Sequence, residues 1–224
     1  MPNYTLSLGL LLVPLVLFVV LALWGKLLFA KTAGYMAVIG TLITTAIALF
    51  IAYNFFYNNP TVQGTYSAIT VFSYPWLVFT KDLAITIGIE LDALSVMMIV
   101  VVNIVSLMVH LYSLWYMKGE ERYVRFFAYL SLFCFSMVGL VLSGNIFQIY
   151  IFWELVGVSS FLLIGFYFQK PSAVAAAKKA FIVTRFADFI FLVGILVLGW
   201  QLQSFDVQLL ITKAQALHQA GVLA

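Results

Sequence analysis

An acidic residue lies inside an apolar segment of the sequence. Residues 150–166 read YIFWELVGVSSFLLIGF, and Glu154 is the only charged residue among them. Nine residues into an apolar helix, at about 1.5 Å per residue, its carboxyl would lie about 13 Å deep, near the middle of a bilayer. A charged group there costs about 2.5–3.5 kcal/mol, so it must be protonated or have a partner. Burial favours the protonated acid and a nearby cation favours the carboxylate, a competition that suits proton transfer. The alternative is a glutamate that only bonds neighbouring helices.

More charged residues lie in the apolar segment 174–200. Arg185 and Asp188 are three residues apart and therefore share a helix face. Lys178 lies on the same side, seven residues before Arg185, so a chain of charged groups could lead inward from the helix end with Lys179. Two plainer alternatives are a self-neutralising Arg185–Asp188 pair and lysines that only anchor the helix at the membrane interface.

A polar stripe is predicted on a third apolar segment. Asn103, Ser106, His110 and Ser113 follow one another at spacings of three, four and three residues, which places them on one helix face. His110 could accept and release protons near neutral pH. It could equally be a satisfied hydrogen-bond donor between helices.

The composition identifies the class of protein that must position these residues. Of the 224 residues, 65% are hydrophobic and 8% are charged, against about 45–50% and 25% in soluble domains. The chain is therefore an integral membrane protein. Its formal charge of +3 is spread between apolar segments, which indicates membrane topology and no nucleic-acid partner.

The sequence offers no recognisable means of holding a redox cofactor. The single cysteine, Cys134, excludes a disulfide framework and a thiolate metal cluster. There is no GxGxxG fingerprint or Walker P-loop, and the two histidines, His110 and His218, fall in different predicted elements. We expect this chain to bind no cofactor and no metal.

Six apolar stretches are long enough to cross a hydrocarbon core of about 30 Å. The first lacks a basic region before it and a cleavage site after it, so we expect it to be retained as a helix and not removed as a signal peptide. The sequence thus predicts an all-α polytopic membrane protein with about six transmembrane helices, over residues 6–25, 33–56, 92–117, 124–143, 145–168 and 174–200.

Two further segments lie outside these spans. In LAITIGIELD, residues 83–92, apolar residues alternate with others, and with the preceding WLVF they predict a β-hairpin on the membrane surface. Residues 201–224 place Val207, Leu210, Ile211, Ala214 and Leu217 on one face, as in an interfacial amphipathic helix. We therefore divide the chain into 1–91, with two helices and the hairpin, 92–200, with the other four helices, and 201–224.

The basic residues predict which ends of the helices face the cytoplasm. Eight fall at one end of the predicted spans and only Lys81 and Lys213 at the other, with Arg185 left inside a span. Because cytoplasmic loops are enriched in Lys and Arg, we expect the N-terminus and the hairpin to lie outside. The eight are Lys26, Lys31, Lys118, Arg122, Arg125, Lys170, Lys178 and Lys179.

Three stretches of the chain resemble a known family. They are HLYSLWYMKGEERYVRFFAYLSLFCFSMVGLVLSGN, FWELVGVSSFLLIGFY and AAAKKAFIVTRFADFIFLVGI. They are similar to the N-terminal part of the largest antiporter-like membrane subunit of the proton-pumping NADH:quinone oxidoreductase, respiratory complex I, called subunit L in bacteria and subunit 5 in mitochondria. The similarity extends over essentially the whole chain, including the hairpin segment.

This resemblance implies a function and roles for the charged residues. Glu154 would be the protonatable acid of a proton half-channel, and Lys178, Lys179, Arg185 and Asp188 would support the same channel. The partners would be the other membrane subunits of the complex, and the location would be a bacterial plasma membrane. NADH, FMN, iron–sulfur clusters and quinone would be bound by other subunits of the complex and not by this chain. The family continues beyond the position of Ala224 with a broken seventh helix, so we expect a fragment or a truncated product.

Two alternatives remain at this stage. The large subunit of a multisubunit Na⁺/H⁺ antiporter shares the WE helix and much of the fold, although the RFF and TRFAD stretches favour complex I. A chain without the lysine of the seventh helix could also be an inert membrane spacer.

Overall fold

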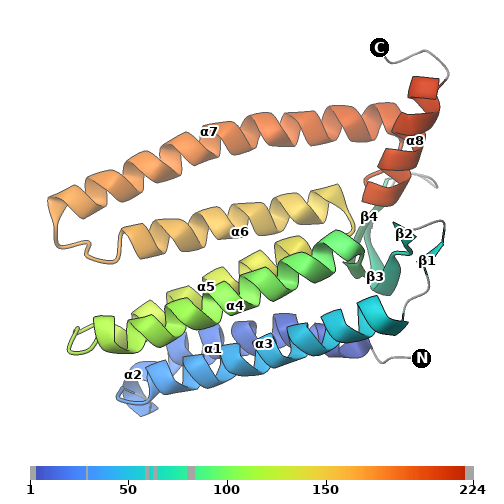
Figure 1. Cartoon of the computed structure of the whole chain (residues 1–224). Coiled ribbons are helices and arrows are strands. Elements are labelled where there is room, and N and C mark those ends of the chain that lie inside the picture. The colour runs from blue at the N-terminus through green and yellow to red at the C-terminus, as the bar shows by residue number, and fades with distance from the viewer. Residues whose placement is uncertain (1–3, 29, 59–60, 63–64, 80–83, 220–224) are drawn as a thin grey trace.

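The computed structural model describes residues 4–28, 30–58, 61–62, 65–79 and 84–219. Six helices in this part of the chain are long and apolar enough to cross a membrane, which confirms the predicted all-α polytopic fold. They run antiparallel to their neighbours in sequence (Figure 1). Their bounds are α1 (Ser7–Leu23, preceded by the 3₁₀ turn η1, Tyr4–Leu6), α3 (Ala33–Asn58), α4 (Ala93–Tyr116), α5 (Tyr123–Val141), α6 (Ile146–Ile164) and α7 (Pro171–Leu202).

The shorter elements lie at the two ends of the helices. A single turn, α2 (Gly25–Leu28), joins α1 to α3, and α8 (Val207–Gln219) follows α7. Two antiparallel pairs of strands lie between α3 and α4: β1 (Thr61–Val62) with β2 (Thr65–Tyr66), and β3 (Ile69–Val78) with β4 (Ala84–Leu91).

The predicted β-hairpin is confirmed and is longer than the sequence indicated. Its first strand was expected only over WLVF, but β3 begins at Ile69 and pairs with β4 from Ile69↔Leu91 to Val78↔Ala84. The ladder is irregular between Thr70 and Phe72 and between Pro75 and Leu77. Such bulges tolerate a proline and obscure the period-2 pattern, which explains the underestimate.

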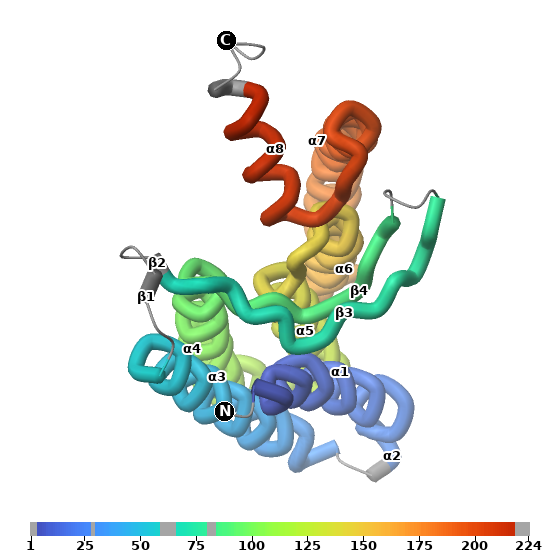
Figure 2. Tube along the Cα trace, turned by 90° about the vertical axis from the view of Figure 1, so that its right-hand side faces the viewer, coloured from blue at the N-terminus to red at the C-terminus, as the bar shows by residue number. Residues whose placement is uncertain are grey.

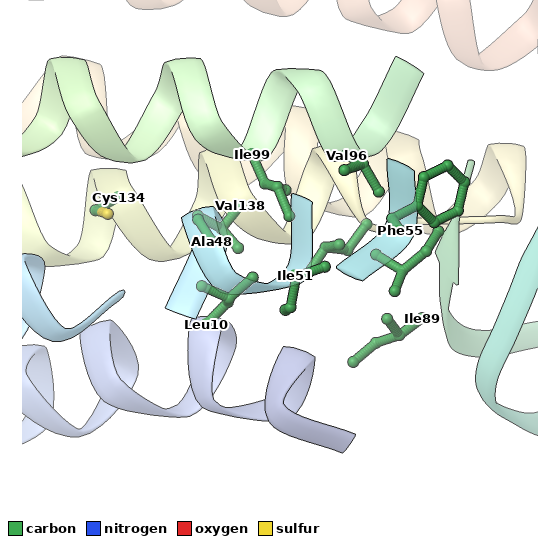
Figure 3. Packing of buried hydrophobic residues seen from close by; sticks show 11 residues of the cluster. Leu10, Ala48, Ile51, Phe55, Ile89, Val96, Ile99, Cys134 and Val138 are labelled. Carbon is green, nitrogen blue, oxygen red and sulfur yellow. The ribbon is translucent and has the colours of Figure 1, made fainter. Parts of the chain in front are cut away.

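The hydrophobic core lies among α1, α3, α4, α5 and β4. Figure 3 shows its main cluster, in which Leu10, Ala48, Ile51, Ile99 and Val138 meet between the helices. By contrast, α7 lies at the edge of the bundle and packs mainly against α6 (Figures 1 and 2). The α6–α7 interface is therefore the outermost layer of the described structure.

The loops segregate to opposite ends of the bundle as predicted. The hairpin, the N-terminal turn and α8 lie at one end, and the connections α1–α3, α4–α5 and α6–α7 lie at the other (Figure 1). These three connections carry Lys26, Lys31, Lys118, Arg122 and Lys170, and the first turns of α5 and α7 carry Arg125, Lys178 and Lys179. Lys213, on α8, is at the hairpin end, and Lys81 lies outside the described residues. We call the two ends the basic end and the hairpin end.

The segment after α7 forms a helix with the expected apolar side. Leu210 is buried and Val207, Ala214 and Leu217 are partly shielded, whereas Ile211 is exposed. The side chain of Asp206 accepts a hydrogen bond from Leu209 N at 3.0 Å and caps the helix start. Residues 201 and 202 belong to α7, and 220–224 lie outside the described residues. The interfacial position of α8 stays a prediction.

Hydrogen bonds tie the hairpin to the helix connections. Ile146 N donates to Phe205 O at 2.9 Å and Val207 N donates to Gly144 O at 3.0 Å, which joins the α5–α6 and α7–α8 turns. The Gln148 side chain both accepts from Gly88 N at 2.8 Å and donates to Gly88 O at 2.9 Å. These bonds fix the start of α6, the helix that carries Glu154, against β4 and against the end of α7.

The pKa of Glu90, a titratable group at this junction, predicts that the stability of the fold depends on pH. Burial, together with the nearby Asp206 and Asp92 carboxylates, raises the pKa of Glu90 although a Gln208 hydrogen bond opposes this. The folded state therefore holds the Glu90 proton more tightly than the unfolded state, so this group favours folding less as the pH rises. We expect Glu90→Gln to raise the thermal midpoint by about 1–2 °C at pH 8 and by less at pH 5.

Thermal unfolding in mild detergent at the two pH values measures this effect. Glu121→Gln, an exposed acid at the basic end, is the matched control and should change neither midpoint. A gain for Glu90→Gln that is larger at pH 5 would contradict the raised pKa.

Candidate functional site

Glu154 lies on the face of α6 that meets α7. Asn145 begins α6 by accepting hydrogen bonds from Phe147 N at 2.9 Å and Gln148 N at 3.4 Å. At 1.5 Å per residue, Glu154 is about 12 Å from the first residue of this helix, Ile146. Its side chain is 16% exposed. The acid is therefore partly shielded and lies inside a candidate span, and its depth in a bilayer stays a prediction.

The Glu154 carboxylate has one partner on its own helix and one on the next. The Tyr150 hydroxyl, four residues earlier, donates to Oε1 at 2.6 Å. The guanidinium of Arg185 on α7 pairs with Oε2, and its side chain is 44% exposed. The acid is thus bound by a neutral donor and a permanent cation, the kind of partner that a carboxylate inside a span requires.

Arg185 and Asp188 each bond a residue of α6 instead of each other. Asp188, which is 6% exposed, accepts a hydrogen bond at Oδ1 from Trp153 Nε1 at 2.8 Å. The adjacent pair Trp153–Glu154 therefore bonds two α7 residues that are three positions apart. The self-neutralising pair considered from the spacing does not describe these two side chains.

A largely apolar cavity of about 420 Å³ opens beside this ion pair. Tyr150, Glu154 and Arg185 line it together with four apolar residues of α7, and the Arg185 guanidinium lies 4.9 Å from the centre of the Phe181 ring. Apolar walls strengthen the attraction between the charges, because the local dielectric is low. If the carboxylate takes up a proton, the pair loses its attraction and the guanidinium is released. The four apolar residues are Phe181, Ile182, Phe186 and Phe189.

The other predicted residues lie apart from this ion pair. Lys178 lines a different cavity, between α5, α6 and α7, and Lys179 is exposed. His110 is fully buried on α4, with Nδ1 2.8 Å from Ser106 O and its ring 6.1 Å from that of Phe127. The structure thus brings Glu154 and Arg185 together, brings Asp188 beside them, and leaves the proposed relay roles of Lys178, Lys179 and His110 as predictions.

The polar stripe on α4 has the predicted geometry. Asn103, His110 and Ser113 are buried, and the backbone carbonyl oxygen of Asn103 connects to α3 by accepting a hydrogen bond from Thr45 Oγ1 at 3.2 Å. His110 Nε2 has no hydrogen-bond partner among the described residues. The stripe faces the interior of the bundle.

Sequence reasoning missed two residues of the site. Tyr150 precedes Glu154 by four residues, so the helical spacing alone could have identified it as a neighbour. Trp153 could not have been paired with Asp188 from the sequence, because their contact depends on the relative position of α6 and α7.

The fold is that of antiporter-like membrane subunits. The chain superposes with a TM-score of 0.73 on a chain of an archaeal respiratory complex, the membrane-bound sulfane sulfur reductase, at 20% identity over 91% of this chain and 39% of that one. It superposes with a TM-score of 0.72 on a chain of the Mrp complex from Dietzia sp., at 20% identity over 91% of this chain and 20% of that one.

Two family models and close relatives identify the family. Residues 76–127 match the model described as NADH-ubiquinone oxidoreductase (complex I), chain 5 N-terminus, and residues 143–223 match that of NADH:quinone oxidoreductase/Mrp antiporter, TM. Chloroplastic NAD(P)H-quinone oxidoreductase subunit 5 of Chara vulgaris is 47% identical over 73% of this chain. That of Anthoceros angustus is 42% identical over 87%. The chain belongs to the complex I subunit 5 (subunit L) family and spans about a quarter of the length of these relatives, 24% and 26% respectively.

Proposed function

We propose that this chain forms part of the membrane arm of a proton-translocating NADH:quinone oxidoreductase and contributes a proton half-channel centred on Glu154. The observation that carries the proposal is the bonding of Glu154, a carboxylate inside a span, to Arg185 on the neighbouring span. The proposed partners are the other membrane subunits. NADH, FMN, iron–sulfur clusters and quinone would bind elsewhere in the complex, so this chain alone would catalyse no redox step.

The geometry supports a charge switch in which a proton competes with a cation. With Glu154 ionised, the pair with Arg185 is closed, and Tyr150 stabilises the carboxylate through its hydrogen bond. A proton that reaches Glu154 neutralises its carboxylate. The attraction to Arg185 is then lost, which favours movement of Arg185 into the adjoining cavity. Trp153 holds Asp188, one turn along α7, and so keeps the two helices in register while the pair opens.

The second candidate function is that of a large subunit of a multisubunit Na⁺/H⁺ antiporter. The Mrp structure with a similar fold favours it. Affinity purification of the tagged full-length protein from its native membrane separates the two. Stoichiometric copurification of flavin and iron–sulfur subunits supports the oxidoreductase, whereas copurification of small antiporter subunits without flavin or iron would replace it by the antiporter.

We further propose that the hairpin end faces outward and the basic end faces the cytoplasm. The clustering of Lys and Arg in the three loops of the basic end and in the first turns of α5 and α7 supports this orientation. A bacterial plasma membrane is the first candidate location, and the chloroplastic relatives make a chloroplast membrane the second.

Single-sided cysteine labelling tests the orientation. Ala68, beside the hairpin, and Glu121, at the basic end, are both exposed, and we expect Ala68→Cys to react with an impermeant maleimide only from outside and Glu121→Cys only from inside. The native thiol, Cys134, is buried, so the unsubstituted protein serves as the unlabelled control. Equal labelling of both positions from one side would contradict the six-span topology, and reversed labelling would contradict the orientation.

A further inference from the structure

A second cavity lies at the basic end, separate from the cavity at Glu154. It measures about 250 Å³ and is enclosed by the start of α5, the end of α6 with the following turn, and the start of α7. Three cationic side chains line it: Arg122, which precedes α5, Arg125 from α5 and Lys178 from α7. Its remaining wall is almost wholly apolar and includes Phe161 and Phe166.

The three cations have no carboxylate partner in the described part of the chain. The ion pair found there is Glu154–Arg185, and the nearby Glu120 instead accepts a hydrogen bond from the Tyr167 hydroxyl at 3.2 Å. The Arg122 guanidinium lies 3.6 Å from the centre of the Phe168 ring. Such stacking fixes its position and leaves its N–H groups free to donate. Arg122 also lines a neighbouring cavity with Glu120 and Glu121, but no salt bridge joins them. Three cations that line one cavity, none of them in an ion pair among the described residues, indicate a site for an anionic ligand.

The length of α7 allows the cavity to lie at the phosphate level of a bilayer. Helix α7 has 32 residues, or about 48 Å at 1.5 Å per residue, which exceeds a hydrocarbon core of about 30 Å. Its first turns, which carry Lys178, can therefore extend into the headgroup region. Arg122 and Arg125 lie at the start of α5, so all three cations are close to the membrane surface.

The lining of the cavity, which is both cationic and apolar, favours a phospholipid over a free phosphate. A free phosphate needs only polar donors, whereas Phe161, Leu162, Phe166 and Val174 provide an apolar wall beside the cations. A phospholipid has both parts, a phosphate and a glycerol with acyl chains. We propose that this cavity binds the headgroup of an anionic phospholipid, with the phosphate between Arg122, Arg125 and Lys178 and the acyl chains against the apolar wall.

Photo-crosslinking in nanodiscs tests the proposal on the full-length protein in its assembled complex. Photoactivatable phosphatidylglycerol and photoactivatable phosphatidylcholine are compared at equal mole fraction, and the labelled peptides are identified by mass spectrometry. We expect phosphatidylglycerol to label the peptides around residues 122–129 and 161–178 about tenfold more than phosphatidylcholine does. Excess inorganic phosphate should leave this labelling unchanged.

Paired variants separate a specific site from general attraction to a basic surface. The double variant Arg125→Gln/Lys178→Gln should lower phosphatidylglycerol labelling to about the phosphatidylcholine level, since each basic residue near an anionic surface contributes about fivefold. The control Lys31→Gln/Lys118→Gln removes two exposed charges of the same end outside the cavity and should change labelling less than about twofold. Arg125→Lys/Lys178→Arg keeps both charges and should restore labelling, which excludes misfolding as the cause of the loss.

Three results would overturn the proposal. Equal labelling by the two lipids would remove the preference for an anionic headgroup. Equal losses in the two double-glutamine variants would reduce the effect to surface charge. Displacement of the lipid by inorganic phosphate would replace the lipid site by a site for a soluble anion.

Discussion

Glu154→Gln is expected to abolish most proton transport while leaving the complex assembled. Glutamine keeps the size and hydrogen-bonding capacity of the side chain but cannot bind and release a proton, and a positioned acid or base typically contributes at least about 100-fold to a proton-transfer step. We expect proton uptake to fall by about tenfold or more. The measurement is proton uptake into sealed vesicles that contain the assembled complex, normalised to subunit content.

The order of variants at this position distinguishes proton transfer from a structural bond. Glu154→Asp keeps the acid but withdraws it by one methylene, about 1.5 Å, so its loss should be smaller than that of Glu154→Gln. A glutamate that only bonds neighbouring helices would tolerate Gln at least as well as Asp. Glu121→Gln makes the same chemical change at an exposed acid and should pump normally. Pumping by Glu154→Gln equal to wild type, with normal assembly, would remove Glu154 from the proton path.

Arg185→Gln is expected to lower both proton transport and stability. It leaves the partly buried Glu154 carboxylate without its cation, and removal of one partner of a buried pair destabilises by about 3–5 kcal/mol. Because Arg185 is 44% exposed, solvent screening reduces this to about 1–2 kcal/mol. Arg185→Lys keeps the charge and should retain part of both properties. Thermal unfolding in detergent and vesicle proton uptake provide the two measurements.

A double-mutant cycle shows whether the two residues act through each other. In Glu154→Gln/Arg185→Gln neither charge is left without its partner, so the double variant should be more stable than Arg185→Gln alone, with a coupling of about 0.5–3 kcal/mol. The control Thr184→Val removes a hydroxyl that bonds only the backbone of its own helix and should couple to neither residue. Strictly additive losses would show that the ion pair does not link them.

The spans could be predicted from the sequence because the bilayer imposes a length and a composition that are visible without any partner. The position of Glu154 inside a span followed from the same argument. The length of β3 could not be predicted, since pairing with β4 carries the strand through Pro75 and two irregularities that disturb the alternation. Spacing rules describe one element at a time and fail where two elements must be aligned.

The hydrogen bonds and the ion pair of the site show the same difference between contacts within one helix and contacts between two helices. Tyr150 and Glu154 are on one helix, so their contact is implied by a separation of four residues. The same rule paired Arg185 with Asp188, because it considers only partners on α7. Their actual partners, Glu154 and Trp153, are on α6. Only the packing of α6 against α7 decides that choice.

The backbone bonds at the hairpin end limit how the ion pair can open. Helices α6 and α7 are joined by residues 165–170 at the basic end. At the hairpin end, two backbone hydrogen bonds, Ile146 N to Phe205 O and Val207 N to Gly144 O, connect the start of α6 to the segment that follows α7. Because the two helices are connected at both ends, they cannot slide past each other without breaking one of these connections. In the proposed switch, the Glu154–Arg185 pair would therefore open by rotation of side chains, which occurs within nanoseconds at exposed positions and much faster than shifts of helix register. Gating at this position would then be set by the arrival of the proton and not by the motion of the helices.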